Sequence, residues 1–300
     1  MRRTLRALLL LTALAGPCAA SALEQLPTWG PAPLPPPVAV PARAAGISGD
    51  VSPLALPYFL GGRRAWVYLP PGYGGSSRRY PVVYMQDGQN LFDPAASYSG
   101  EWRVDETCEA LMGAGDIIPF IVVGVENGGA ARMVEYTPWP DPEHGGGGAD
   151  AYLSSLKTVL KPEIDRRYST LPDPAHTYIA GSSLGGLLAA YAGFSDPGTW
   201  GGVIALSPSY WWADEKFKAW AAGRPKPQLK VFYQDMGTLE GSDHAKYMET
   251  LRAVERTALA KGFREGEDLY SMEIPGHNHS EASWSQRLPW ILKLLFPARP

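Results

Sequence analysis

The sequence predicts an α/β fold in which a mainly parallel central sheet carries helices on both faces. Short continuous apolar segments recur along the chain, and segments with the apolar periodicity of a helix lie between them. Continuous apolar strands are typical of sheets that are covered on both faces, and strands that alternate with helices of this length pair in parallel. A length of 300 residues, with 45% hydrophobic and 19% charged residues, suits one globular domain, and no internal repeat is visible.

The expected strands are short and end at turn residues. Arg64 to Leu69 alternates between polar and apolar residues and stops at Pro70. The other expected strands are continuous apolar runs at residues 80–85, 120–125, 177–180, 203–206 and 229–233, with a last strand near Tyr270.

Five segments between these strands have helical patterns, at residues 104–112, 149–168, 184–193, 245–261 and 283–296. In the first of them, apolar residues fall at i, i+4, i+7 and i+8, which is one face of a helix. Cys108 lies on that face. We therefore expect it to pack in the core as a free thiol, and the protein to have no disulfide.

The N-terminus has the pattern of a secretory signal peptide over residues 1–22. Its parts are a positive region (Arg2, Arg3 and Arg6), an apolar run over residues 7–15 and small residues at 20–22. We expect export to the periplasm or the medium. Pro17 does not fit the pattern of a lipoprotein signal, so Cys18 is expected to be removed with the signal peptide.

A proline- and alanine-rich linker is expected over residues 23–46, followed by the globular domain over residues 47–300. No other uncharged stretch is long enough to span a bilayer, so we expect no stable membrane anchor. A net charge of −3 without a basic block argues against nucleic acid as a partner. The sequence leaves the oligomeric state open.

The segment from Gly181 to Gly185 has the form G-x-S-x-G, with Ser183 at its centre. An apolar strand precedes it and a helical run of small residues follows. In that context the motif is typical of a nucleophile elbow, where small flanking residues allow a tight turn. The alternative is a glycine-rich turn that only packs a helix on a strand. The context favours Ser183 as a catalytic nucleophile.

A second glycine loop, residues 86–93, follows the strand at 80–85. A glycine loop that enters a helical turn offers backbone N–H groups to an oxyanion. In α/β-hydrolases such a loop supplies one donor, and the residue after the nucleophile, here Leu184, supplies the other. The alternative, which is compatible with the first, is an Asx turn in which Asp87 caps its own backbone.

Three acids and two histidines are placed to complete a triad in the order serine, acid, histidine. Asp235, Glu240 and Asp243 all follow the strand at 229–233, and His277 and His279, two of five histidines, follow the last strand. We expect Asp235 to brace the turn and Asp243 to cap the next helix. A zinc site at the two histidines is the alternative to a catalytic base, but spacing indicates no third ligand.

Several segments resemble a known family. They are residues 84–93, 135–138, 181–186 and 235–240, and His279 with Trp284 five residues on. These resemble the bacterial "putative esterase" family of α/β-hydrolases over residues 64–296. That family includes enterochelin-type siderophore esterases, feruloyl and acetyl xylan esterases, esterase D and the mycolyltransferases.

The resemblance implies an α/β-hydrolase fold and a Ser183 nucleophile, with Glu240 as the acid and His279 as the base. It implies that the oxyanion donors are the N–H groups of Leu184 and Gln89. No metal and no organic cofactor is expected. His277 departs from the family pattern, because it is a second imidazole two residues from the expected base.

Aromatic residues are abundant, with ten tryptophans in the chain. We expect Trp102, Tyr136, Trp211 and Trp212 to lie in loops around the site and to contact substrate, and the alternative for each is a place in the core. Aromatic walls suit sugars, aryl esters or catechols. Residues 139–148, rich in glycine, are expected to form a mobile flap near the pocket.

The leading interpretation is a secreted or periplasmic serine carboxylic-ester hydrolase that acts through an acyl-enzyme on Ser183. Its substrate is expected to be a small-molecule or carbohydrate-linked ester. One alternative is an acyltransferase of mycolyltransferase type with the same triad. The other is a non-catalytic carbohydrate-binding protein on a hydrolase scaffold.

Overall fold

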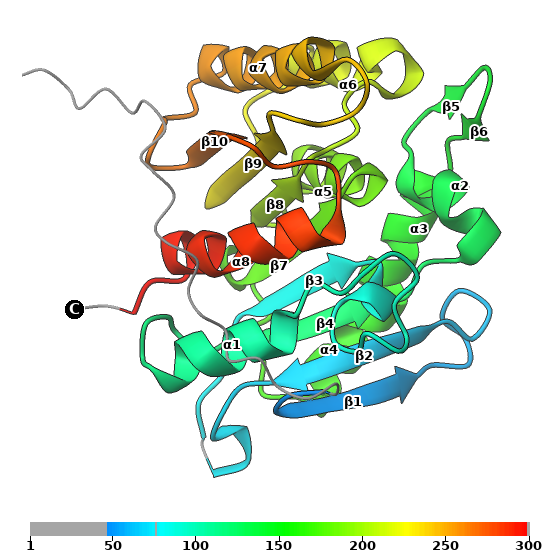
Figure 1. Cartoon of the computed structure of the whole chain (residues 1–300). Coiled ribbons are helices and arrows are strands. Elements are labelled where there is room, and N and C mark those ends of the chain that lie inside the picture. Colours follow the sequence, from blue (N-terminus) through cyan, green and yellow to red (C-terminus); the bar gives the residue numbers. More distant parts are fainter. Residues whose placement is uncertain (1–46, 76, 299–300) are drawn as a thin grey trace, which may run out of the picture. The chain divides into compact units, whose positions relative to one another are not determined.

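The computed structural model describes residues 47–75 and 77–298, so the predicted signal peptide and linker lie outside the described residues. Eight strands form one sheet in the order β1-β2-β4-β3-β7-β8-β9-β10 (Figure 1). β1 pairs antiparallel with β2, and β2 with β4, whereas all later pairs are parallel. The prediction of a mainly parallel sheet is confirmed.

The strands of this sheet are short and mostly buried on both faces. Their bounds are β1 Asp50–Ala55, β2 Arg64–Leu69, β3 Val82–Gln86, β4 Ile121–Val125, β7 Thr177–Ser182, β8 Gly202–Leu206, β9 Val231–Gly237 and β10 Leu269–Ile274. β1 was not expected from the sequence. It is an edge strand with a mixed burial pattern, and therefore lacks the continuous apolar run that marks the central strands.

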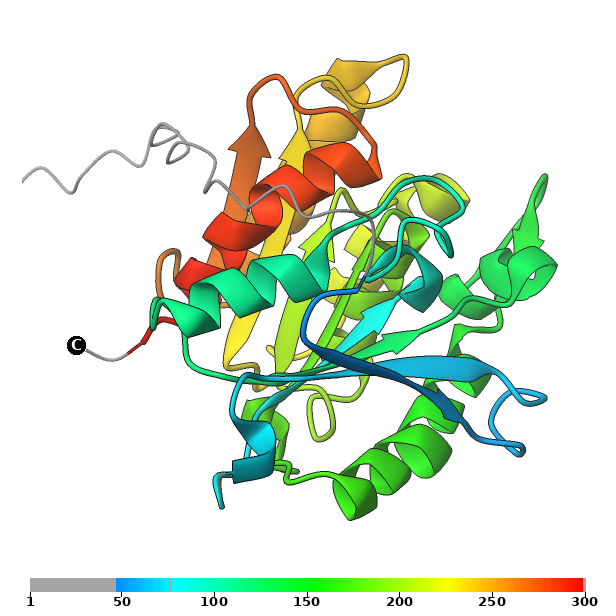
Figure 2. The ribbon, with the colours of Figure 1, turned by 60° about the horizontal axis from the view of Figure 1, so that its bottom comes forward.

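Helices cover both faces of the sheet, as predicted (Figures 1 and 2). α1 (Val104–Gly113) and α8 (Glu281–Leu295) pack together on one face. The opposite face carries α3 (Ala149–Ser155), α4 (Lys161–Arg167), α5 (Leu184–Ser195), α6 (Trp212–Ala222) and α7 (His244–Ala260). A short helix, α2 (Arg132–Tyr136), packs against α3 and α5.

The two faces form two separate hydrophobic cores because side chains alternate along a strand. In β3, Val82 and Tyr84 belong to the core under α5, and Val83 and Met85 belong to the core under α1 and α8. Cys108 lies in the second core, buried and free, as the sequence predicted. Among the residues that the structure describes, no helix is both long and apolar enough to cross a membrane.

Three elements differ from the sequence prediction. The expected helix over residues 149–168 is interrupted by a π-helical segment at Leu156–Leu160, directly before α4, in which Pro162 cannot donate a backbone hydrogen bond. β9 runs to Gly237, so Asp235 lies within the strand and not in the loop after it. Residues 139–148 contain a small hairpin, β5 (Pro140–Asp141) with β6 (Gly145–Gly146).

Candidate active site

Ser183 occupies the sharp turn between β7 and α5. Its backbone has φ 57° and ψ −125°, a conformation that is rare for residues other than glycine and typical of strained functional turns. A Cβ at Gly181 would lie 2.7 Å from the backbone carbon of Gly185. Both ends of the motif must therefore approach closely, and only glycine at position 181 allows it. The glycines of the local sequence therefore allow the sharp turn at Ser183.

The Ser183 hydroxyl faces a pocket of about 960 Å³. Its Oγ lies 3.3 Å from Ser209 Oγ, and its backbone N–H donates to Leu206 O at 3.1 Å. The pocket is lined by residues from the segments after several strands, among them Gln89, Trp102, Ser183 and His279, and by Glu281 and Trp284 of α8. Loops at the carboxyl ends of parallel strands thus converge on the serine, as this class of fold requires.

Glu240 and His279 form a hydrogen-bonded pair beside that pocket. His279 Nδ1 lies 2.9 Å from Glu240 Oε2. The other oxygen, Oε1, accepts the Gly237 N–H at 2.7 Å and the Ser207 hydroxyl. Burial raises the pKa of Glu240, but the hydrogen bonds from His279 and Ser207 outweigh it, so the pKa lies below its usual value. A buried, ionised carboxylate therefore orients the imidazole.

The other acids have different partners. Asp243 is the N-cap of α7 and accepts the Lys246 N–H at 3.1 Å, as expected. Asp235 was expected to brace a turn through local backbone bonds, and this is wrong. It lies in β9 and pairs with Arg287 Nη1 at 2.8 Å, because its side chain points under α8.

The second histidine lies away from the acid. His277 Nδ1 contacts the Ser283 backbone oxygen at 3.2 Å. Burial, together with the nearby Arg287, lowers its pKa. In the described part of the chain, neither His277 nor His279 belongs to a group of three residues with metal-ligating atoms close together. The structure thus offers no third ligand for the zinc alternative.

A buried arginine supports the acid, and no feature of the sequence indicates it. Arg287 has no exposed surface, and its Nη2 lies 3.1 Å from Ser207 Oγ and 3.7 Å from Glu240 Oε1. Ser207 also accepts the Trp284 indole N–H at 2.8 Å. The Ser207 hydroxyl therefore accepts hydrogen bonds from two donors and donates its own O–H to Glu240. These hydrogen bonds fix the carboxylate in one orientation.

The glycine loop after β3 is held by a charged network and not by an Asx turn. Asp87 has φ 57° and makes no capping bond to its own backbone. Its carboxylate instead accepts two bonds from Arg132, at 2.7 and 2.8 Å, and one from Asn127 at 2.6 Å. A Cβ at Gly88 would lie 2.4 Å from the Gly124 carbonyl carbon, so this position also requires glycine.

Of the four aromatic residues expected around the site, Trp102 lines the pocket and packs on Trp284 with ring centroids 5.5 Å apart. Tyr136, Trp211 and Trp212 are not among its lining residues, so that expectation is corrected.

Each of these three aromatic residues belongs to the other core. Tyr136 is fully buried, and its hydroxyl accepts the Asp87 N–H at 3.1 Å. Trp212 is buried at the start of α6 and donates to the Trp139 backbone oxygen at 2.7 Å. Trp211, half-buried, packs beside it against the same core. These rings pack in the interior because burial of their large apolar area is favourable.

The expected flap does not reach the pocket either. No residue of the segment 139–148 is among the lining residues of the pocket that contains Ser183. Asp141 accepts the N–H groups of Glu143 and His144, at 3.0 Å each, and closes the hairpin turn. The glycine run is therefore part of a hairpin: Gly145 and Gly146 form its strand β6, and both have a positive φ that glycine allows.

Comparison with known proteins places the chain in a family. Residues 61–295 match the family model described as "Putative esterase". The chain is 26% identical over 244 residues to "Uncharacterized protein YbbA" of Bacillus subtilis, covering 77% of this chain and 93% of that protein. It is 31% identical over 135 residues to the siderophore triacetylfusarinine C esterase of Aspergillus fumigatus, covering 44% of this chain and 45% of that protein.

The alignment thus spans less than half of the fungal esterase. Among solved structures, a ferulic acid esterase superimposes with a TM-score of 0.63 at 16% identity, covering 83% of this chain and 98% of that one. This likeness confirms the α/β-hydrolase fold. Because the family match extends over most of its length, the chain belongs to the "Putative esterase" family of carboxylic-ester hydrolases.

Proposed function

We propose that this protein is a serine esterase that hydrolyses its substrate through an acyl-enzyme on Ser183. The observation that carries the proposal is the Glu240–His279 pair at 2.9 Å, whose imidazole lines the same pocket as Ser183. The strained backbone of Ser183 presents its hydroxyl to that pocket. A nucleophile, a base and an acid that orients the base are the three parts that ester hydrolysis of this type needs.

In the proposed reaction, His279 Nε2 takes the proton of Ser183 as the hydroxyl oxygen attacks the ester carbonyl. The tetrahedral intermediate collapses, the C–O bond to the alcohol breaks, and His279 returns the proton to the leaving oxygen. His279 then deprotonates a water molecule, which attacks the acyl carbonyl. The bond from the acyl carbon to Ser183 Oγ breaks, His279 returns the proton to that oxygen, and the acid and free Ser183 are released. Glu240 stays ionised throughout and stabilises the imidazolium.

Two backbone N–H groups are proposed as the oxyanion donors. Leu184 is the first residue of α5, so its N–H has no acceptor within the helix. Gln89 lies in the short 3₁₀ turn Gly88–Asn90 and lines the pocket, and the same argument applies to its N–H. Removal of one such donor costs about 3 kcal/mol of transition-state stabilisation in comparable sites.

We propose that the substrate is a small-molecule or carbohydrate-linked ester with an aromatic part. The exposed Tyr98 lines the pocket together with the nearly buried Trp102 and Trp284, and a planar ring can stack on Tyr98. Two of the proteins named above are, by their names, a siderophore triacetylfusarinine C esterase and a ferulic acid esterase. We also propose, from the signal-peptide pattern of residues 1–22, that the protein works after export.

Trapping the acyl-enzyme tests the mechanism. Mixing the protein with p-nitrophenyl acetate should give a burst of p-nitrophenol and a mass increase of one acetyl group on the peptide that contains Ser183. Ser183→Ala should show neither. A panel of acetyl, feruloyl and catecholate esters then ranks substrates, and added glycerol separates hydrolysis from acyl transfer. Absence of turnover on every ester would support the non-catalytic alternative and overturn the proposal.

A further inference from the structure

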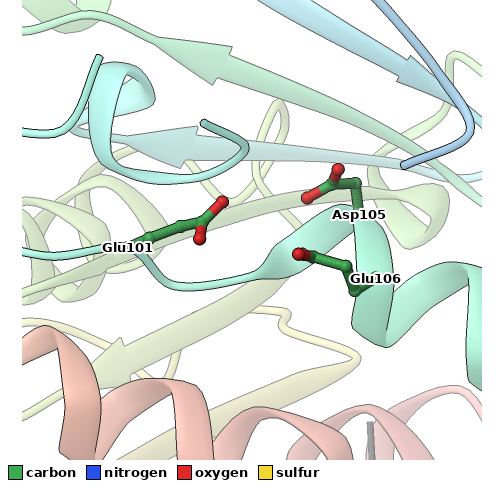
Figure 3. A group of neighbouring side chains, drawn as sticks. All are labelled: Glu101, Asp105 and Glu106. Carbon is green, nitrogen blue, oxygen red and sulfur yellow. The ribbon is translucent and has the colours of Figure 1, made fainter. Parts of the chain in front are cut away.

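Three carboxylates converge at the start of α1, outside the catalytic triad. Glu101 lies directly before Trp102, and Asp105 and Glu106 lie in the first turn of the helix (Figure 3). Each offers one carboxylate oxygen, and these oxygens all lie within 4.8 Å of one another. Two adjoining pieces of backbone, a loop and a helix start, thus hold three like charges at short range.

The group is buried, yet several of its oxygens have no partner in the described structure. Asp105 is 0% exposed; its Oδ2 accepts the Ser48 N–H at 2.5 Å, whereas its Oδ1 accepts no hydrogen bond. Oε2 of Glu106, a residue that is 9% exposed, and Oε1 of Glu101 also accept none. Buried carboxylate oxygens are normally hydrogen-bonded or bound to a metal, so these atoms point to a ligand.

Positive charge from the chain balances only part of this group. Arg103 Nε lies 3.6 Å from Glu106 Oε1. The N-terminus of α1 adds roughly half of a positive charge. When all three carboxylates are ionised, as a bound cation requires, their charge exceeds these contributions by more than one negative charge. A divalent cation supplies that charge and also ligates the oxygens that lack a hydrogen bond.

We propose that Glu101, Asp105 and Glu106 bind a calcium ion. Calcium–oxygen distances are about 2.3–2.6 Å, so two ligands on opposite sides of one ion lie about 5 Å apart. Oxygens within 4.8 Å of one another fit inside that sphere. Magnesium takes its ligands at about 2.0–2.1 Å in a strict octahedron, which would require these carboxylates to move closer.

The ion has a structural place beside the pocket. Trp102 lies between two of the ligands in sequence and lines the pocket of Ser183. Asp105 also accepts the N–H of Ser48, which precedes β1. Calcium therefore fixes the segment that carries Trp102 to the first turn of α1, and with it one wall of the pocket. It takes no part in the chemical step.

Terbium luminescence tests the site, because Tb³⁺ replaces calcium at oxygen ligands and is excited through a nearby tryptophan. The purified protein, stripped with EDTA and transferred to metal-free buffer, is titrated with Tb³⁺ under excitation of tryptophan. We expect a saturable signal that added Ca²⁺ removes. Saturating Ca²⁺ should also raise Tm by about 5–10 °C relative to EDTA, at roughly a hundredfold excess over Kd.

Matched variants locate the binding. Asp105→Asn should weaken Tb³⁺ binding at least about tenfold and abolish the Ca²⁺-dependent rise in Tm. Asp116→Asn removes the same charge from an acid that pairs with Lys293 at 2.7 Å, and should change neither. If Asp105→Asn does not fold, Glu101→Gln at the partly exposed edge of the group serves instead.

Equal Tb³⁺ signals in the wild type, Asp105→Asn and Asp116→Asn would overturn the proposal, since the lanthanide would then bind elsewhere. An unchanged wild-type Tm between EDTA and Ca²⁺ would also overturn it. Neither result depends on the esterase mechanism, because both measurements are made without substrate.

Discussion

The chain buries two groups of acidic side chains that differ in whether their carboxylate oxygens have partners within the protein. Around the triad, Asp235 and Glu240 are fully buried and share the guanidinium of Arg287. At the start of α1, Asp105 is just as buried, but it and Glu106 keep oxygens without hydrogen bonds. In the first group, other residues of the chain supply the hydrogen-bond and charge partners of the carboxylates. In the second group, the proposed calcium ion supplies the partners that the chain does not.

The pKa values separate Glu240 of the first group from Asp105 of the second. Burial raises the pKa of both Glu240 and Asp105. At Glu240 the bonds from His279 and Ser207 prevail and lower the pKa below its usual value. At Asp105 burial prevails over the Ser48 N–H, and the pKa rises to about 8. Donors from His279 and Ser207 therefore lower the pKa of Glu240, whereas burial raises the pKa of Asp105, and also that of Asp235 in spite of the nearby Arg287 and Tyr233.

The largest expected effect is on kcat, and it tests whether catalysis depends on the triad and not on the acidic group at the start of α1. Ser183→Ala should lower kcat by at least about 10⁴-fold, because the nucleophile is lost while the turn is kept. Tm and the Ca²⁺ response should not change. Steady-state hydrolysis of p-nitrophenyl acetate and a thermal melt measure both. Ser182→Ala is the control and should keep most of the activity; the reverse result would shift the nucleophile by one position.

The same substitution in each group gives the next largest contrast. Glu240→Gln keeps the volume but favours the wrong imidazole tautomer, so kcat should fall about 10²- to 10⁴-fold with little change in KM. Glu106→Gln should leave kcat within about threefold at saturating Ca²⁺, because Glu106 does not line the pocket. A fully active Glu240→Gln enzyme would move the acid role to another residue.

A second matched pair tests stability and should give opposite signs. Asp235→Asn removes the closer of the two carboxylates that pair with the buried Arg287 and should lower the free energy of unfolding by about 3–5 kcal/mol. Asp105→Asn, measured in EDTA at neutral pH, removes a carboxyl whose raised pKa costs stability above its ordinary pKa, and should raise that free energy by about 1–3 kcal/mol. Denaturant melts measure both. Equal losses in the two variants would mean that the groups do not differ.

The smallest effect is a pH dependence of the first group. The pKa of Glu240 lies below its usual value of 4.5, so its contribution to stability is present above that pH and is lost as pH falls through the lowered pKa. The difference in unfolding free energy between the wild type and Glu240→Gln should therefore shrink below about pH 4.5. A difference that is constant from pH 7 to pH 3 would contradict the assignment.

The comparison also shows how far sequence reasoning reaches. The elbow at Ser183 was predictable, because a strand, a turn with Gly181 and Gly185, and a helix are local features with a strict steric requirement. The parallel sheet was also predictable, because continuous apolar strands that alternate with helices are a local pattern in the sequence. The glycine loop at Gly88 belongs to this class too, since its backbone approaches Gly124 too closely for a side chain.

Aromatic residues were the least predictable. Tyr136 lies between Glu135 and Thr137 in the sequence, and Trp212 is followed by Ala213 and Asp214, so no apolar run marks these rings as buried; yet they pack in the core or against it. Trp102 is buried as well, in the other core, and it also lines the pocket. A ring of this size buries its area wherever the fold leaves room, and that space is set by other elements.

The sequence by itself determined the alternation of strands and helices, the strained serine and the order of the triad residues, because each follows from local patterns of size and polarity. Tertiary structure decided which partner each buried charge has. Chain order could not choose among Asp235, Glu240 and Asp243. In the folded chain, Asp235 pairs with Arg287, Glu240 binds His279, and Asp243 caps α7. Electrostatic pairing acts through space over a few ångströms, so only the folded chain settles it.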